Sequence, residues 1–156
     1  MIIKNWMHKN PVTISSEASA SDAGNLLDEK KLPFIPVVDA GKLRGILTRR
    51  DLREAASCAT ATQSIHEVNY FNTRLKVKDL MIRMPLTLSV DDTVETALAR
   101  GRQFGRSFFP VMDGGNLVGT ISGRDITAAF HQILGVSQKL SGVTVEIDEN
   151  NGEMEK

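Results

Sequence analysis

Phe34-Ile35-Pro36-Val37-Val38-Asp39-Ala40-Gly41 returns 74 residues later as Phe108-Phe109-Pro110-Val111-Met112-Asp113-Gly114-Gly115. Both stretches are apolar and rich in residues that favour β-strands, and both end in Asp-x-Gly, which is typical of a hairpin turn. The expected partner strands are residues 43–48 and 117–122. The proline inside each first strand cannot donate a ladder hydrogen bond, which favours an edge position or a strand start. The sequence therefore predicts two similar hairpins.

The same offset aligns the rest of the two halves without a gap. It pairs Pro11 with Pro85, Thr13 with Thr87 and Asp51 with Asp125, among many other matches. Such sustained self-similarity is the mark of a structural repeat. In each copy a short opening segment runs into Pro-x-Thr, where proline forces an extended or turning chain. Each copy then continues with a helix, the hairpin and a second helix.

The helix boundaries follow from capping residues. Ser19 in the first copy and Thr93 in the second are good N-caps for the first helix. Small and apolar residues then follow at helical spacing. The second helix is expected to begin near Arg50 and near Arg124. The unit thus reads βαββα, once over residues 1–57 and again over residues 76–135, with a partly packed connector at 58–75. Residues 136–156 form a tail in which Val143 to Ile147 could be a strand.

This pattern resembles the CBS domain, a family named after cystathionine β-synthase. The resemblance rests on Pro-x-Thr at the start, Pro-Val-x-Asp in the middle and Gly-x-x-Ser/Thr-x-x-Asp near the end, and it covers about residues 3–134 in two copies. It implies an α+β fold in which two tandem repeats pack with pseudo-twofold symmetry, as in a stand-alone bacterial or archaeal CBS pair (a Bateman module). The family further implies clefts between the repeats, a homodimer, and binding of AMP, ADP, ATP or S-adenosylmethionine to regulate a protein target.

The ribose-binding residues implied by the family are Thr48 and Asp51 in one copy and Ser122 and Asp125 in the other. An aspartate at the start of a helix can accept hydrogen bonds from paired ribose hydroxyls, and charge-assisted bonds of this kind are strong. The same Ser/Thr-x-x-Asp spacing is also a helix capping box that needs no ligand. The two roles are compatible, so both stay open.

Arginines near this motif are candidates for phosphate contacts. Arg49, Arg50 and Arg124 are close enough in sequence to reach a phosphate, although each is equally an ordinary solvated side chain. Many nucleotide-binding relatives carry a basic residue just before the Pro-Val strand, whereas here Pro33 to Ile35 and Ser107 to Phe109 occupy these places. This departure favours an adenosine ligand with little or no phosphate. Arg106 could compensate in one site.

The adenine base would need an apolar slot and exposed backbone edges. By resemblance these come from two pairs of residues and two nearby valines: Thr13, Ile14, Thr87, Leu88, Val37 and Val111. The alternative for each of them is a place in the core or in a turn.

Composition and motifs exclude several classes of function. The formal net charge is +0 and no apolar run approaches the roughly 20 residues of a membrane span, so neither a nucleic acid nor a membrane is an expected partner. The single cysteine, Cys58, excludes an internal disulfide and CxxC chemistry, and we expect a cytoplasmic protein. Phosphate loops, a zinc-protease motif and a serine-hydrolase elbow are absent from the sequence. We therefore expect neither an enzyme nor a resident metal or cofactor.

Two further interpretations stay open. The chain could be a structural or oligomerisation module with empty clefts, because the basic residues before the Pro-Val strands are missing. It could also be the regulatory part of a longer protein that continues into an ACT domain, because the strand-like segment 143–147 lies close to the end of the sequence.

Overall fold

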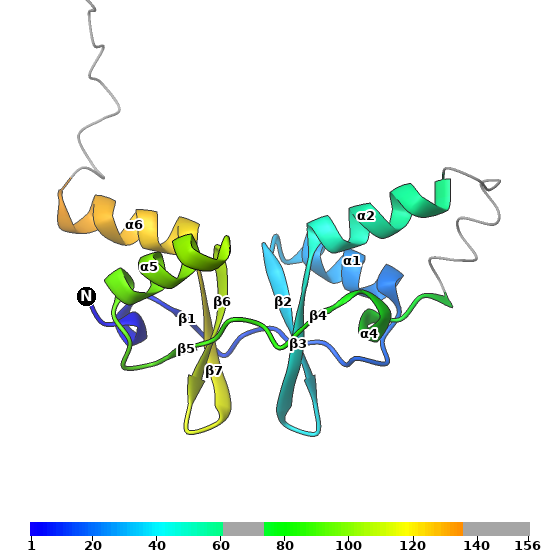
Figure 1. Ribbon diagram of the computed structural model, residues 1–156, viewed down its shortest axis with the longest axis horizontal. Coiled ribbons are helices and arrows are strands. Elements are labelled where there is room, and N and C mark those ends of the chain that lie inside the picture. The colour runs from blue at the N-terminus through cyan, green and yellow to red at the C-terminus, as the bar shows by residue number, and fades with distance from the viewer. Residues whose placement is uncertain (61–73, 136–156) are drawn as a thin grey trace, which may run out of the picture.

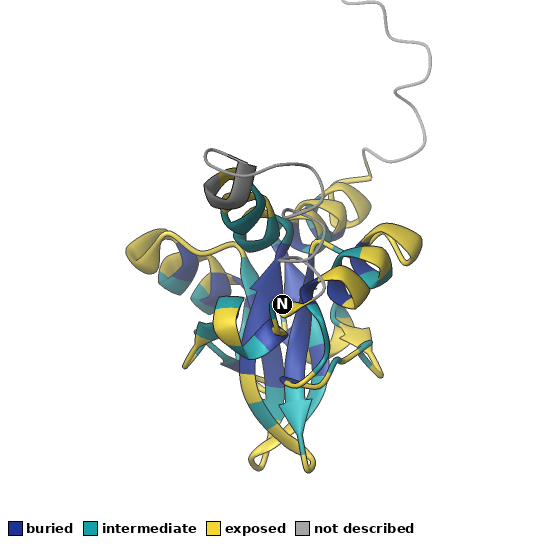
Figure 2. Cartoon of the chain, turned by 90° about the vertical axis from the view of Figure 1, so that its right-hand side faces the viewer, coloured by how far each residue is buried: buried dark blue, intermediate teal, exposed yellow. Residues whose placement is uncertain are grey.

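The computed structural model describes residues 1–60 and 74–135, except the side chains of residues 58–60. The predicted strand at Val143 to Ile147 and most of the predicted connector lie outside the described residues. The fold is α+β, and its two halves stand side by side with strands in the middle and helices outside (Figure 1). The buried residues gather on these central strands, and the hairpin tips are exposed (Figure 2).

The repeated unit gives matching elements in both halves. The first half contains α1 (Ala20–Glu29), β2 (Phe34–Asp39), β3 (Lys42–Thr48) and α2 (Arg49–Thr60); the second contains α5 (Val94–Phe104), β6 (Phe108–Asp113), β7 (Asn116–Ser122) and α6 (Gly123–Ile133). Ser19 accepts a hydrogen bond from the Asp22 backbone N–H and Thr93 accepts one from that of Thr96. The predicted N-caps and hairpins are therefore confirmed.

The hairpin turns adopt the backbone that Asp-x-Gly predicted. Ala40 and Gly41 have φ values of 48° and 75°, and Gly114 and Gly115 have values of 56° and 86°. Two consecutive positive φ angles characterise the type I′ turn, whose twist suits antiparallel strands.

The prolines do not mark edge strands. β6 lies inside the four-stranded sheet β1-β7-β6-β5. β2 ends the sheet β2-β3-β4, but Ile14 pairs with its outer side: the Ile14 N–H donates to the Pro36 carbonyl oxygen and the Val38 N–H donates to that of Ile14. The predicted edge position is therefore wrong in both halves. Pro110 is tolerated in β6 because β5 (Leu88–Ser89) pairs in parallel only with Val111 and Met112, beyond the proline. The missing N–H therefore removes no ladder bond on that side.

The opening segments are exchanged between the halves. β1 (His8–Lys9) pairs with β7 of the second copy, and β4 (Ile82–Arg83) pairs with β3 of the first. The two pairings are equivalent, since His8 lies opposite Thr120 and Ile82 lies opposite Ile46. Each structural half thus takes its outermost strand from the other sequence repeat.

The exchange extends into the two hydrophobic cores. Short helical turns precede the exchanged strands, η1 (Ile3–Asn5) and α4 (Val77–Leu80). Ile3 is completely buried among second-copy residues such as Val94 and Phe109. Val77 is completely buried among first-copy residues such as Ala23 and Leu47. Each core therefore depends on a residue from the other repeat.

Glycines permit the exchanged strands to approach closely. A Cβ atom on Gly45 would lie 2.5 Å from the Ile82 carbonyl oxygen, and one on Gly119 would lie 2.6 Å from the Met7 sulfur and 2.8 Å from the His8 carbonyl oxygen. The repeated glycine in Gly-x-x-Ser/Thr-x-x-Asp is therefore explained by backbone approach rather than by a turn.

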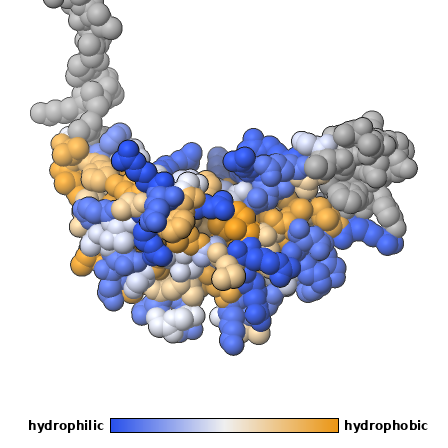
Figure 3. All heavy atoms as spheres, viewed as in Figure 1, coloured by the Kyte–Doolittle hydropathy of each residue, from blue (hydrophilic) through white to orange (hydrophobic). Residues whose placement is uncertain are grey.

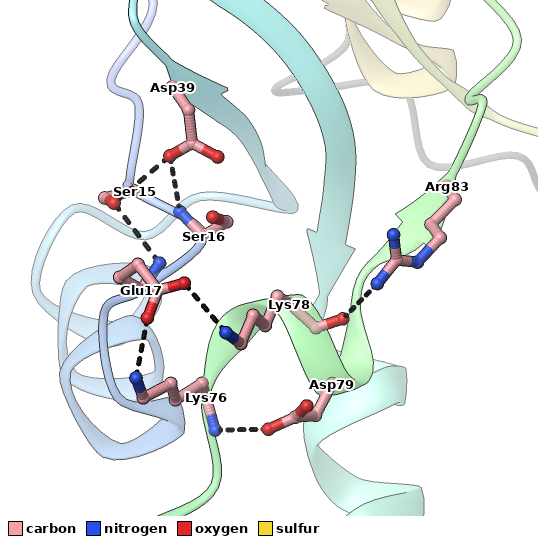
Figure 4. Close-up of polar contacts among 8 residues, drawn as sticks. All are labelled: Ser15, Ser16, Glu17, Asp39, Lys76, Lys78, Asp79 and Arg83. Carbon is pink, nitrogen blue, oxygen red and sulfur yellow. Dashed lines mark hydrogen bonds and ion pairs between the residues drawn. The ribbon is translucent and has the colours of Figure 1, made fainter.

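Polar contacts attach the second opening segment to the first half (Figure 4). Lys76 and Lys78 donate to the two carboxylate oxygens of Glu17 at 2.6 and 2.8 Å. These lysine hydrogen bonds lower the pKa of Glu17. Asp39 accepts from the Ser16 backbone N–H at 3.0 Å and from the Ser15 hydroxyl at 3.2 Å. The loop before α1 is thus held between β2 and the exchanged segment.

Candidate ligand-binding site

Both Ser/Thr-x-x-Asp motifs lie where a hairpin strand ends and the following helix begins. The N-terminal ends of α2 and α6 face each other across the middle of the molecule (Figure 1). A cavity of about 1470 Å³ is lined by Thr48 and Asp51 from one repeat and by Ser122 and Asp125 from the other. The structure therefore brings the four predicted ribose residues together around one space.

In the first copy the motif is a closed capping network. One carboxylate oxygen of Asp51, Oδ2, accepts from the Thr48 backbone N–H and from the Thr48 hydroxyl, each at 2.8 Å. The same hydroxyl accepts from the Asp51 backbone N–H at 3.3 Å. Among the residues that the structure describes, no side chain or backbone group donates to Asp51 Oδ1. This oxygen is the one available to a ligand.

In the second copy the same network carries one additional partner. Asp125 Oδ2 accepts from the Ser122 backbone N–H and hydroxyl, each at 2.7 Å. The Nε2 atom of His8 lies 2.8 Å from Asp125 Oδ1, and because a carboxylate only accepts, His8 is the donor. The capping role of both motifs is therefore confirmed, and the two aspartates differ in whether Oδ1, the oxygen left over by the cap, already has a hydrogen-bond partner.

The cavity is markedly basic, although the whole chain has no net charge. Its lining contains three carboxylates, Asp51, Glu54 and Asp125. It also contains eight lysines and arginines: Lys9, Lys30, Lys31, Arg49, Arg50, Arg53, Arg106 and Arg124. The space-filling view shows hydrophilic residues on both halves along the upper edge, where α2 and α6 begin (Figure 3). A concave site of one sign of charge concentrates ligands of the opposite sign.

The four predicted phosphate residues all line this cavity, but they differ in whether their guanidinium groups already have partners in the protein. The Arg49 guanidinium forms an ion pair with Asp28 and donates to the carbonyl oxygens of Leu27 and Leu32. The guanidinium of Arg49 is thus already bonded to the C-terminal end of α1 and the residues that follow it. Arg50 pairs with Glu54 one turn along α2, at 2.9 Å.

Arg106 and Arg124 have no side-chain hydrogen bond or ion pair with the residues that the structure describes, and both are exposed. Of the four predicted phosphate residues, these two are therefore free to meet an anion.

The predicted base residues lie mostly elsewhere. Val37, Val111 and Leu88 are buried in the two cores and line neither cavity. Thr13 and Ile14 also lie outside the lining, whereas Thr87 lines a second cavity of about 420 Å³. Residues just before the predicted ones also line the cavities: Asn10, Pro11 and Val12 line the first, and Met84, Pro85 and Leu86 line the second.

The sequence interpretation missed the contribution of the exchanged strands. His8, Lys9 and Ile82 line the first cavity, and Ile82 and Arg83 line the second. Their sequence signal was the contrast between His8 and Ile82 at equivalent positions of an otherwise well-matched repeat. Lys30 and Lys31, at the end of α1, were missed as well.

Other kinds of site find no support in the described part of the chain. Within residues 1–60 and 74–135, no three His, Cys, Asp or Glu side chains are grouped so that they could hold a metal ion. None of the helices described there has the length and apolar character needed to cross a membrane.

Comparison with known proteins agrees with this architecture. The family model described as "CBS domain" matches residues 3–57 and again residues 77–132. A homoserine O-acetyltransferase of Methanococcus vannielii is 31% identical over 128 residues, which are 81% of this chain and 24% of that protein. The chain thus spans about a quarter of the length of this relative.

Two solved structures of similar size are close in fold. The crystal structure of CBSX2 in complex with AMP has a TM-score of 0.70 and 26% identity, covering 85% of this chain and 98% of that one. The CBS domain pair of protein MJ0100, in complex with 5′-methylthioadenosine and S-adenosyl-L-methionine, has a TM-score of 0.69 and 26% identity, covering 83% and 99%. The doubled family match, the exchanged βαββα halves and these neighbours lead to one conclusion: the chain belongs to the CBS domain family, as a tandem pair.

Proposed function

We propose that this chain is a regulatory module that binds an adenosine nucleotide between its two repeats and passes the binding on to a partner protein. The observation that carries the proposal is the basic cavity lined by both Ser/Thr-x-x-Asp motifs. The AMP complex of CBSX2 and the adenosine-derivative complexes of MJ0100 support the ligand class.

The charge of the cavity ranks the candidate ligands. The excess of lysine and arginine over carboxylates favours an anionic ligand, and so favours AMP, ADP or ATP over S-adenosylmethionine, whose sulfonium centre is cationic. Arg106 and Arg124 are the side chains that we assign to the phosphate. This ranking reverses the expectation of little or no phosphate, which rested on the missing basic residues before the Pro-Val strands.

The ribose would be held by the aspartates and not by the neighbouring hydroxyls. Thr48 and Ser122 are 8% and 4% exposed, and their hydroxyls already serve Asp51 and Asp125. The second carboxylate oxygen of each aspartate is the acceptor that we assign to the ribose diol. Binding would then leave the helix caps intact, so capping and ligand contact coexist.

Regulation would follow from the position of the cavity between the halves. A ligand that contacts both repeats favours the arrangement of the halves to which it binds better, and a partner can respond to that shift. We assign no reaction to the module itself. The homodimer, the cytoplasmic location and the identity of the protein target belong to this proposal, as does a place within a longer protein such as a CBS-ACT enzyme.

The first experiment is a thermal unfolding series with AMP, ADP, ATP, S-adenosylmethionine and GMP. A ligand at 100 times its dissociation constant should add about 2.7 kcal/mol, which raises Tm by several degrees. We expect the adenosine phosphates to stabilise the protein and the Arg106→Ala, Arg124→Ala double variant to lose most of that effect. The exposed Arg44, outside both cavities, gives the matched control Arg44→Ala, which should keep it.

A second candidate is a structural module without a ligand. The observation in its favour is that both motifs cap their helices in the folded chain without a ligand. Three exposed apolar residues could serve for assembly: Leu98 on α5, Ile133 at the end of α6 and Leu134 directly after it. A flat response to every nucleotide, together with a stable dimer by sedimentation, would select this candidate.

A further inference from the structure

The internal repeat provides a comparison between the two ribose-binding carboxylates within one molecule. His8 and Ile82 occupy equivalent positions: each is the first residue of an exchanged strand, and each lies opposite the equivalent residue of the strand that it joins. The backbone therefore presents a side chain to the same place in both halves. Only the side chain differs, an imidazole at one site and an aliphatic group at the other.

The imidazole occupies the ligand-facing oxygen of Asp125. Its Nε2–H donates to Oδ1 at 2.8 Å, while Oδ2 is taken by Ser122. Both oxygens of Asp125 are thus engaged. At Asp51 only Oδ2 is engaged by the described residues, and Ile82 has no polar atom in its side chain to reach the other oxygen. The two sites are therefore unequal before any ligand arrives.

The contact can be broken without unfolding. The His8 side chain is 72% exposed and Asp125 is 17% exposed, so the imidazole can swing into solvent while the aspartate stays at the start of α6. A ribose hydroxyl that binds Asp125 Oδ1 must first displace this hydrogen bond. A ribose that binds Asp51 Oδ1 displaces no protein group.

We propose that His8 acts as a latch on Asp125, so that the two sites bind the same adenosine ligand with unequal affinity and the Asp51 site fills first. The proposal rests on the proposed function, because it concerns the affinity of the same ribose contacts. A hydrogen bond with an exposed donor contributes about 0.5–1.5 kcal/mol net, which corresponds to roughly 2- to 10-fold in affinity.

The test is isothermal titration calorimetry with AMP, and with adenosine as a probe without phosphate. Asp51→Ala protein retains only the Asp125 site, and adding His8→Ile to it should tighten binding roughly 2- to 10-fold. Asp125→Ala protein retains only the Asp51 site. There His8→Ile should change nothing, and Ile82→His should weaken binding by a similar factor.

The outcomes separate this proposal from the broader one. If wild-type protein binds neither AMP nor adenosine, the proposed function fails and the latch with it. If wild-type protein binds and His8→Ile leaves the Asp125 site unchanged or weaker, the latch alone is overturned. Should an aspartate variant not fold, wild type and His8→Ile are compared directly: two unequal sites that become more equal support the latch, and no change refutes it.

Discussion

Gly45→Ala tests whether the exchanged strands hold the two halves together. The new Cβ would lie 2.5 Å from the Ile82 carbonyl oxygen and 3.1 Å from the Met81 sulfur. Met81 can move because its side chain is flexible, but Ile82 presents backbone. β3 and β4 must therefore separate, and their two paired positions, Gly45 with Arg83 and Ile46 with Ile82, are weakened.

The size of the loss can be worked from these contacts. Overpacking at a site that cannot relax costs about 1–3 kcal/mol, and each weakened hydrogen bond costs about 0.5–1.5 kcal/mol. We expect Gly45→Ala to lower the free energy of unfolding by about 2–4 kcal/mol, which lowers Tm by roughly 5–15 °C for a chain of this size. Gly119→Ala should act similarly through the β1–β7 pair.

The assay is thermal and urea unfolding with Gly24→Ala as the matched control. Gly24 lies inside α1, and its nearest atom beyond the helix backbone is Leu52 Cδ1 at 3.7 Å, an ordinary contact. Alanine there should raise stability by about 0.5–1 kcal/mol. If the Tm of Gly45→Ala lies within about 1 °C of the wild-type value while Gly24→Ala behaves as expected, the close approach of β4 is not the reason for a glycine at position 45.

Three further predictions concern stability. Lys76 and Lys78 lower the pKa of Glu17 from 4.5, and Glu17 raises the pKa of Lys78 from 10.5, so this cluster stabilises the fold between these pH values. This stabilisation is lost as the pH falls through the lowered pKa of Glu17 or rises through the raised pKa of Lys78. Glu17→Gln should therefore have a lower free energy of unfolding than wild type at neutral pH and the same value in strong acid. Ser122→Ala removes the N-cap of α6 and should cost about 1 kcal/mol by urea unfolding. Val77→Ala should cost about 1.5–3 kcal/mol, because Val77 is completely buried, and an unchanged urea midpoint would contradict its place in the first-copy core.

The repeat, the hairpins and the helix caps were predictable because each is a local property of sequence. Asp-x-Gly specifies a turn wherever it follows a β-prone run, and Ser19 or Thr93 caps a helix through contacts within one turn. The Ser/Thr-x-x-Asp spacing likewise specified the capping boxes of both second helices. These features need no knowledge of the rest of the chain.

The exchange of the opening strands was not predictable from the repeat. When two copies share one pattern, β1 can complete the edge beside β3 or the one beside β7 with nearly identical contacts, and the alignment does not distinguish them. The predicted base-contact residues lie mostly outside the two cavities for a related reason. Val37 and Val111 are as apolar as a base-binding slot requires, but the same property places them in the cores.

Under the proposed function, the exchange would let a ligand bound at the two short motifs affect the contact between the repeats. Asp125 belongs to the second repeat, whereas His8, the side chain that contacts Asp125 Oδ1, belongs to the first. The strand that carries His8 follows the turn whose Ile3 is buried in the second-copy core. A ligand that moves His8 therefore acts at a junction between the repeats, and not on the surface of one of them. In the other half Ile82 has no polar side-chain atom to contact Asp51 Oδ1, so under the proposed latch a first ligand would bind there without displacing a protein group. Occupancy of the second site, by contrast, would require that the His8 side chain leave Asp125 Oδ1. This difference would let the module respond in two steps to a rising concentration of one ligand.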